Sequence, residues 1–142
     1  MAEGSTDKVA FELVSPERVL ASVEADMVVV PGEDGDFGIL PGHAPMLSLL
    51  RPGVIAVYQG QQAEQRVFVE GGFAEVNPKG LIVLAEAAAP MAELTLEGAR
   101  QDLRNAEEDL ADTRDATQSE RDRLERAIAV ARARVEALEF QG

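Results

Sequence analysis

The sequence predicts an α+β protein in which an N-terminal antiparallel β-sandwich or barrel, residues 1–89, precedes a C-terminal antiparallel hairpin of two helices, residues 90–142. Two observations predict this architecture. Before Pro90, short runs rich in Val and Ile alternate with turns that contain Gly or Pro, at the spacing of about 8–12 residues typical of antiparallel sheets. After Pro90, Gly and Pro become rare, and Leu and Ala recur at helical intervals.

Eight apolar runs in the first part are expected to be strands, because each is short, rich in β-branched residues and bounded by turn-forming residues. These runs are 9–15, 19–23, 27–30, 46–50, 54–58, 66–70, 73–76 and 81–85. The segment 35–45, which reads G-D-F-G-I-L-P-G-H-A-P, is expected to be one rigid, non-helical loop between two of them. Its glycines permit unusual backbone angles, and its prolines fix φ and remove a donor.

Two apolar seams predict the helices. The first consists of Leu96, Ala99, Leu103, Ala106 and Leu110, and the second of Leu124, Ile128, Ala131, Val135 and Leu138. The spacing in each alternates between three and four residues, and a short polar interval joins them, which favours an antiparallel hairpin. Thr95 is expected to cap the first helix, and Thr117 or Ser119 the second.

The seams of the hairpin contain many alanines, which bury little apolar area each. We therefore expect the hairpin to be only marginally stable alone. Two interpretations stay open: a static appendage supported by the sandwich or a partner, and a switch that rearranges between states.

The composition excludes several classes of function. The net charge of −13 argues against nucleic acid as a partner, because phosphate binding needs a basic face. No apolar run approaches the roughly 20 residues of a membrane-spanning helix, and the polar, acidic residues 1–7 do not resemble a signal peptide. We therefore expect no direct insertion into a membrane.

The residues that carry enzyme chemistry are scarce. The chain has no Cys, and His43 is its only His, so no Cys-based or paired-His site is expected. The acidic group Glu33, Asp34 and Asp36 lacks the spacing of a calcium loop, which favours acidic turn residues. There is no phosphate-binding loop or dinucleotide fingerprint. We expect no catalytic residue, no metal and no cofactor.

Two motifs are highly specific together. They are G-D-F-G-I-L-P-G-H-A-P at residues 35–45 and V-E-G-G-F-A-E-V at residues 69–76, followed by the two-helix hairpin. In these motifs and in the order of its domains, the chain resembles the epsilon subunits of bacterial F-type ATP synthases over residues 7–142. The resemblance implies a sandwich of about ten strands with a helical hairpin, which agrees with the pattern of an antiparallel layered fold.

The resemblance also implies a non-catalytic rotor subunit in the central stalk, on the cytoplasmic face of the inner (plasma) membrane. Such a subunit binds the gamma subunit and the c-ring and helps couple proton flow to ATP synthesis. In the family, an acidic loop faces basic loops of the c-ring, and the matching position here is Asp36, with Glu33 and Asp34 close by. His43 is expected on or near the same loop surface.

The hairpin carries two further roles in the resembled family. In many members it inhibits ATP hydrolysis through basic residues of the second helix that contact the catalytic head of alpha and beta subunits; Arg121, Arg123 and Arg126 are the candidates here. Some members bind ATP through [IL]-D-x-x-R-A. The matching stretch is L-E-G-A-R-Q at residues 96–101, where Glu97 replaces Asp and Gln101 replaces Ala. Glu97 and Arg100 can also form an ordinary i,i+3 ion pair.

Three hypotheses follow from these observations. The first is a rotor subunit, with or without inhibition of hydrolysis. The second is a regulatory module whose hairpin senses a nucleotide, and it predicts thermal stabilisation by the ligand. The third is an unrelated enzyme on a β-sandwich, which predicts a convergent polar pocket.

Overall fold

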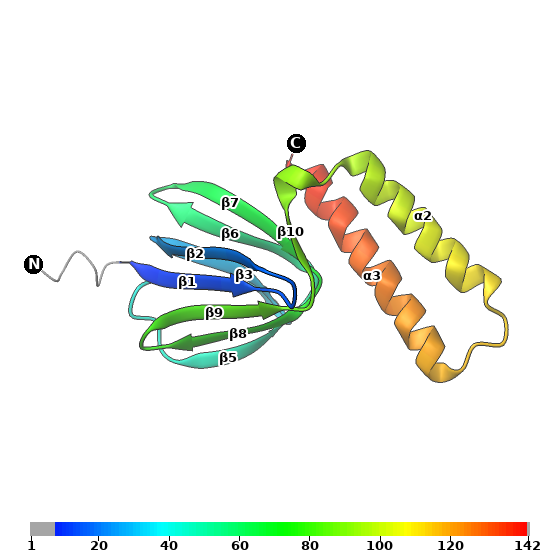
Figure 1. Cartoon of the computed structure of the whole chain (residues 1–142), viewed down its shortest axis with the longest axis horizontal. Helices are drawn as coiled ribbons and strands as arrows, with labels where there is room; N and C mark the ends of the chain where they lie inside the picture. Colours follow the sequence, from blue (N-terminus) through cyan, green and yellow to red (C-terminus); the bar gives the residue numbers. More distant parts are fainter. Residues whose placement is uncertain (1–7, 142) are drawn as a thin grey trace, which may run out of the picture. The chain divides into compact units, whose positions relative to one another are not determined.

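The computed structural model describes residues 8–141, so the expectation for residues 1–7 lies outside the described part. The chain divides into two compact units, residues 1–91 and residues 92–142. The division therefore falls two residues after the boundary at 89 that the sequence analysis expected. Figure 1 shows a β unit that leads into two helices.

Ten strands form the first unit. They are β1 (Val9–Val14), β2 (Val19–Ala25), β3 (Met27–Gly32), β4 (Gly35–Ile39), β5 (Met46–Leu50), β6 (Gly53–Gln59), β7 (Gln62–Val69), β8 (Gly72–Asn77), β9 (Gly80–Ala85) and β10 (Ala88–Pro90). They pair in the order β10-β7-β6-β3-β5-β8-β9-β1-β2, and β4 pairs with β3. All these pairs are antiparallel except β1 with β9. The predicted class, an antiparallel β-sandwich or barrel followed by a two-helix hairpin, is confirmed.

All eight predicted strands are present, with ends that differ by a few residues. The expectation of a single loop over residues 35–45 is wrong in its first half, because Gly35–Ile39 is strand β4. This strand pairs with β3 from Val28↔Ile39 to Gly32↔Gly35, which makes Glu33 and Asp34 a two-residue turn. Only the part from Leu40 onward is a loop.

The core lies between the layers of the sandwich and follows from alternation along the strands. In β1, Val9, Phe11 and Leu13 are buried, whereas Ala10 and Glu12 are exposed. A side chain in a strand points to the face opposite that of its neighbour, so one face of each strand supplies the core. The same alternation in β8 and β9 places the side chains of their other face on the outside of the sandwich.

The second unit is the predicted hairpin. The short 3-10 helix η1 (Met91–Glu93) precedes α2 (Leu96–Asp112), and α3 (Gln118–Gln141) packs against α2. Thr95 caps α2, as predicted, because its side chain accepts a hydrogen bond from the Gly98 amide at 3.0 Å.

Thr117, rather than the alternative Ser119, caps α3. Its hydroxyl accepts from the Glu120 amide at 3.1 Å, and the Glu120 carboxylate accepts from the Thr117 amide at 3.0 Å. This reciprocal arrangement is a capping box. The hydrogen bond from the Thr117 backbone amide, followed by that from the Thr117 side chain, holds the pKa of the Glu120 carboxyl below its usual value.

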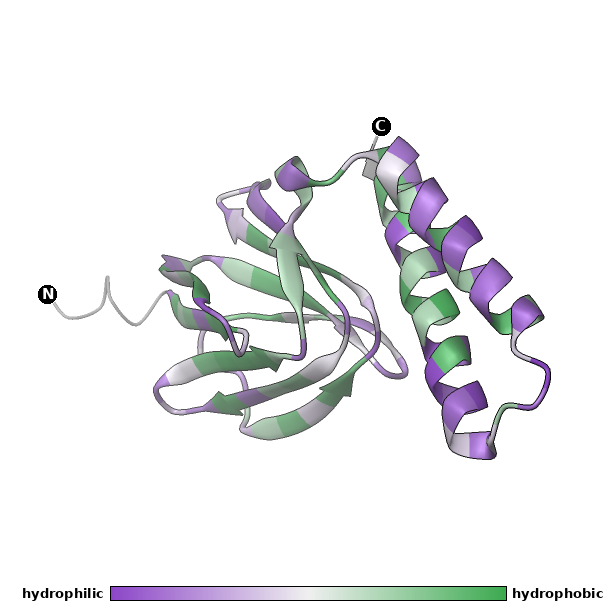
Figure 2. Cartoon of the chain, turned by 45° about the vertical axis from the view of Figure 1, so that its right-hand side comes forward, coloured by the Kyte–Doolittle hydropathy of each residue, from purple (hydrophilic) through white to green (hydrophobic). Residues whose placement is uncertain are grey.

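Hydrophobic residues follow the predicted seams. Ala99, Ala131 and Val135 are buried, and the remaining seam positions are half-buried. Figure 2 shows that apolar residues dominate many of the strands, whereas both helices carry long hydrophilic stretches. Within residues 8–141, no helix is long and apolar enough to cross a membrane.

Candidate docking surfaces

Exposed apolar side chains gather on the outer face of β5, β8 and β9. The register places Leu49 opposite Phe73 and Phe73 opposite Leu84, so the three form a continuous row across the strands. Leu47 and Ile82 lie in the next row of the same face. We call these five residues the outer apolar patch. Side chains directly opposite on neighbouring strands lie about 4.5–5.5 Å apart, so the row is contiguous.

The patch is too exposed to serve as core. Leu47, Leu49, Phe73 and Leu84 keep 69%, 60%, 38% and 42% of their surface accessible. The buried side chains Ala74 and Val83, on the other face of the same strands, already supply the core there. Contiguous exposed apolar surface with charged neighbours typically marks an interaction site. Glu75 provides such a charged neighbour, because it lies between Leu47 and Ile82 in their row.

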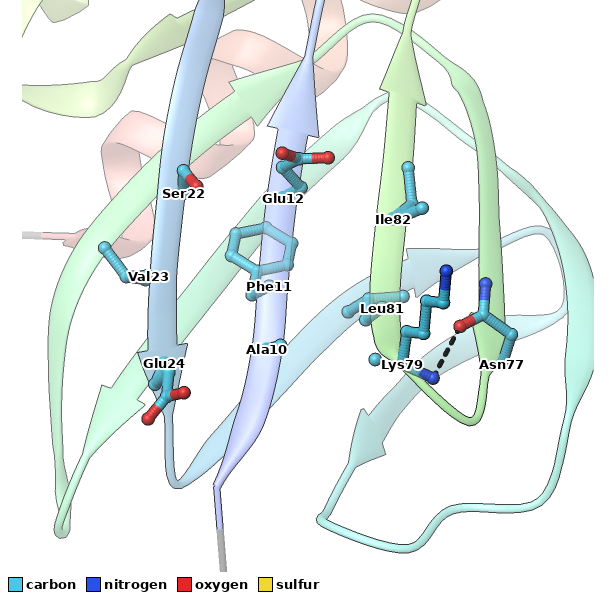
Figure 3. A pocket seen from close by; sticks show the side chains of 11 residues that line it. Ala10, Phe11, Glu12, Ser22, Val23, Glu24, Asn77, Lys79, Leu81 and Ile82 are labelled. Carbon is cyan, nitrogen blue, oxygen red and sulfur yellow. Dashed lines mark hydrogen bonds between the residues drawn. The ribbon is translucent and has the colours of Figure 1, made fainter. Parts of the chain in front are cut away.

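A hollow of about 480 Å³ lies beside this patch, over β1, β2 and β9 (Figure 3). Ile82 and Glu12 line it and sit opposite one another in the β1–β9 register. Glu24 and Lys79 add opposite charges, and the Lys79 amide donates to Asn77 Oδ1 at 2.8 Å. The hollow thus continues the apolar patch as a groove with both apolar and charged side chains in its lining. Ser22 lies opposite Glu12 in the register, but among residues 8–141 no hydrogen bond joins its hydroxyl to a carboxylate or to Lys79.

The predicted acidic residues occupy the β3–β4 hairpin. Glu33 and Asp34 form its exposed turn, and Asp36 lies on β4 opposite Pro31. Gly32 must be glycine, because a Cβ there would lie 2.7 Å from the Gly35 carbonyl oxygen and from the Phe37 ring. The tight turn therefore brings all three carboxylates to one end of the hairpin.

Sequence reasoning missed the partner of Asp36. Arg51, which follows β5, donates from Nη2 to Asp36 Oδ1 at 2.6 Å and from Nη1 to the Gly32 carbonyl at 2.6 Å. The two residues are 15 positions apart, and no local spacing signals this pair. Its only sequence signal is a lone Arg between two apolar strands.

His43 does not join this acidic group. It follows the end of β4 that pairs with Val28, whereas Glu33 and Asp34 precede the other end. Five strand residues separate these ends by roughly 17 Å. The His43 amide donates to the Leu40 carbonyl at 3.1 Å, and Nδ1 lies 2.8 Å from the Ala44 carbonyl oxygen. His43 lines a separate hollow of about 440 Å³.

The three predicted arginines of the second helix lie near the start of α3. Arg123 and Arg126 are exposed and Arg121 is half-buried, and none has a carboxylate within 4.0 Å among the residues that the structure describes. Arg132 and Arg134, later in α3, instead form ion pairs with Glu107 and Asp102 on α2.

The residues of the predicted nucleotide motif line an open hollow of about 400 Å³ on α2. Its lining consists of Leu96, Glu97, Arg100 and Arg104. The i,i+3 ion pair that the spacing of Glu97 and Arg100 allows does not form among the described residues; instead, the Arg100 guanidinium lies 3.3 Å from Glu139 Oε2 on α3. Two guanidinium groups beside one hollow provide donors suited to phosphate oxygens.

Over residues 8–141, no group of three or more His, Asp or Glu side chains is placed to hold a metal ion. The features that remain are an apolar face, an acidic hairpin turn and the start of α3, which carries three arginines and three acidic residues. Each of these suits binding to another macromolecule.

Comparisons with known proteins agree on one family. A family model described as the β-sandwich domain of the ATP synthase delta/epsilon chain matches residues 8–91. The ATP synthase epsilon chain of Parvibaculum lavamentivorans is 49% identical over 121 residues, covering 84% of this chain and 92% of the relative. The epsilon chain of Maricaulis maris is 48% identical over 123 residues, covering 87% and 90%.

The fold recurs in a solved structure of the Euglena gracilis mitochondrial ATP synthase. A chain of that assembly of OSCP, F1 and c-ring superimposes with a TM-score of 0.75 at 22% identity, covering 95% of this chain and 81% of that one. A chain from the central stalk and c-ring of the Tetrahymena thermophila enzyme gives 0.61 at 14% identity, covering 94% and 99%. With its sandwich matched by the family model and most of its length aligned to curated relatives, the chain belongs to the ATP synthase epsilon chain family.

Proposed function

We propose that this chain is a non-catalytic rotor subunit in the central stalk of a proton-translocating F-type ATP synthase, peripheral to the cytoplasmic face of the inner (plasma) membrane. It couples proton flow to ATP synthesis by linking the gamma subunit to the c-ring. The observation that carries the proposal is the outer apolar patch, an exposed row of apolar side chains on a rigid sheet. Membership in the family supports the identity of the partners.

The gamma subunit is proposed to cover the outer apolar patch. Burial of exposed Leu and Phe side chains supplies the main favourable term in such an interface, at about 25 cal/mol per Å² of apolar area. Charged Glu75 and Glu12 lie in the same rows and suit polar contacts. The rigid register of three strands presents the patch already ordered, which lowers the entropic cost of docking.

The c-ring is proposed to meet the β3–β4 hairpin through Glu33, Asp34 and Asp36. Their exposure and common sign give a local negative field that attracts a basic loop. His43 lies at the other end of β4 and stands outside this contact.

The hairpin is proposed to contact the catalytic head through Arg121, Arg123 and Arg126 and thereby to inhibit ATP hydrolysis. Their side chains have no ion-pair partner among residues 8–141, so their charge is available for an acidic partner. Residues 118–142 contain five arginines and five acidic residues, so the segment has no net charge. The attraction to an acidic partner is therefore weak and is screened by salt.

A second candidate function is nucleotide sensing by the hairpin. One observation favours it: Glu97 and Arg100, the residues that match the motif, share a hollow with Arg104. The engagement of Arg100 by Glu139 argues against it, because a bound phosphate would have to displace that carboxylate.

Leu49→Asp tests the docking of gamma. A charge in the centre of an apolar interface should weaken binding to a gamma-containing catalytic head by about 2 kcal/mol, or roughly thirtyfold, as for a central interface residue. The measurement is an equilibrium titration of the isolated head that lacks its own epsilon subunit.

Leu40→Asp is the matched control, since Leu40 is 55% exposed against 60% for Leu49 and lies outside the patch. The control should bind as the wild type does. Equal affinity of both variants would contradict the assignment of gamma to this face.

A further inference from the structure

A single side chain ties together the hairpin that carries the acidic group. Arg51 lies in the connection between Leu50, the last residue of β5, and Gly53, the first of β6. Its guanidinium donates to the Gly32 carbonyl and to Asp36 Oδ1, both at 2.6 Å. Gly32 ends β3 and Asp36 belongs to β4, so Arg51 bridges the two strands of the hairpin.

The backbone reinforces this attachment. The Arg51 amide donates to the Pro31 carbonyl at 3.0 Å, and the Glu33 amide donates to the Leu49 carbonyl at 3.0 Å. The β3 side of the turn is therefore fixed to the end of β5 and to the β5–β6 connection. A Cβ on Gly53 would lie 2.8 Å from the Pro31 Cβ, which shows how closely these segments approach.

Asp36 retains capacity for a second partner. In the described part of the chain, Arg51 engages only its Oδ1, and the Asp36 side chain stays 60% exposed. An ionised carboxylate has about four acceptor sites, so Oδ2 and the remaining Oδ1 lone pair can accept from an external cation. The charges of Glu33, Asp34, Asp36 and Arg51 sum to −2, so the hairpin remains attractive to a basic group.

We propose that Arg51 is the positioning residue of this acidic surface: it holds the Asp36 carboxylate by one oxygen and presents the other to a basic partner group. This inference rests on the proposed function, in which that partner is a c-ring loop. Arg51 makes no contact with the partner itself and acts through Asp36.

The planar fork of the guanidinium explains why the residue is Arg. Its Nη1 and Nη2 atoms reach a carbonyl and a carboxylate at the same time. A lysine carries the same charge on one compact ammonium, which does not reproduce this geometry. Arg51→Lys therefore removes the positioning while keeping the net charge of the hairpin.

The test compares Arg51→Lys, Asp36→Asn and the double variant, with Arg66→Lys as the control at an exposed strand position. Each full-length chain is titrated onto membranes that hold ATP synthase stripped of this subunit, at low and moderate salt. Amide hydrogen exchange over residues 32–37 is measured on the isolated chain, together with the melting temperature.

We expect Arg51→Lys and Asp36→Asn each to weaken binding by about tenfold or more at low salt, as for one charge-assisted hydrogen bond. The double variant should bind no more than twofold more weakly than Asp36→Asn, because Arg51 acts through Asp36. Exchange at residues 35 and 36 should accelerate in Arg51→Lys, with a melting temperature close to that of the wild type. Arg66→Lys should match the wild type throughout.

Three results overturn the inference, and they distinguish a failure of the positioning role from a failure of the c-ring contact. If Asp36→Asn weakens binding but Arg51→Lys does not, or if the two losses multiply in the double variant, the positioning role is wrong and the c-ring contact stands. If Asp36→Asn itself binds as tightly as the wild type, the proposed c-ring contact fails, and the role of Arg51 in it fails as well.

Discussion

At the scale of single residues, Asp26 holds one end of the sandwich together. Its Oδ1 accepts from Lys8 Nζ at 2.6 Å, and its Oδ2 accepts from the Gly60 amide. Asp26 thus joins the β2–β3 turn to the start of β1 and to the β6–β7 turn. The hydrogen bond from Lys8, followed by that from Gly60, holds the pKa of the Asp26 carboxyl below its ordinary value of 3.8.

This lowered pKa predicts a specific acid dependence of stability. A carboxyl with a lower pKa in the folded state stabilises the fold above its unfolded pKa, and the contribution is lost as the pH falls through the folded pKa. We expect Asp26→Asn to lower the free energy of unfolding at pH 7. The difference in this free energy between the variant and the wild type should shrink as the pH falls below about 4. Urea unfolding between pH 7 and pH 2.5 measures both.

Asp34→Asn serves as the control for this prediction, because Asp34 is an exposed turn residue that forms no ion pair in the described part of the chain. Its stability should follow the wild type at every pH. A constant deficit of Asp26→Asn down to pH 2.5 would show that the carboxylate charge is not what stabilises this end.

At the scale of elements, ion pairs link the two helices of the hairpin, and all their side chains are well exposed except that of Arg134, which is 16% exposed. They join Arg100 to Glu139, Arg132 to Glu107 and Arg134 to Asp102, with N–O distances of 3.3, 3.6 and 3.7 Å. Such surface pairs contribute about 0–1 kcal/mol each and weaken with salt. Together with the small alanines of the seam, they agree with the expectation that the hairpin is marginally stable, which stays a prediction.

The Arg100–Glu139 pair offers a test that distinguishes the rotor account from nucleotide sensing by the hairpin. The rotor account requires no nucleotide, so we expect Mg-ATP to leave the melting temperature of the wild-type chain unchanged. Under nucleotide sensing, ATP at 100 times its Kd would stabilise the chain by about 2.7 kcal/mol. Glu139→Gln, which releases Arg100, would then strengthen the effect, and Arg104→Ala would weaken it. Thermal unfolding at increasing Mg-ATP measures all three proteins.

Sequence patterns predicted those elements whose cause is local. The eight strands follow from apolar runs bounded by Gly and Pro, and the cap at Thr95 follows from its side chain and spacing. Strand β4 was missed because its G-D-F-G-I sequence contains two glycines and little apolar alternation; its pairing with β3 supplies the order that its own propensity lacks. The three-residue β10 was missed because A-A-P has no strand signal.

The candidate surfaces were only partly predictable for the same reason. The acidic residues of the β3–β4 hairpin are visible as a cluster in the sequence. Their partner Arg51 and the row of Leu49, Phe73 and Leu84 depend on contacts between distant strands. The separation of His43 from the acidic turn depends on the unpredicted strand between them.

At the scale of the whole molecule, the two compact units carry different proposed contacts. The family model matches residues 8–91, which lie in the first compact unit, and both proposed rotor contacts lie there as well. The proposed inhibitory arginines lie in the second unit, residues 92–142. A docking unit joined to a separate regulatory unit predicts that binding and inhibition can be uncoupled by truncation.

The cut belongs after Met91. A cut after Ala89 would divide β10, whose residues Ala88, Ala89 and Pro90 pair with β7. A chain of residues 1–91 retains all ten strands, and circular dichroism would check that it remains folded.

The most direct test of the rotor assignment is a stoichiometric titration of the full-length chain and of residues 1–91 onto a gamma-containing catalytic head that lacks its own epsilon subunit, with ATP hydrolysis measured in parallel. The account predicts one-to-one binding of both forms with similar affinity, and inhibition by the full-length chain alone. Failure of the folded 1–91 chain and of the full-length chain to bind the head would contradict the assignment of this protein to the central stalk.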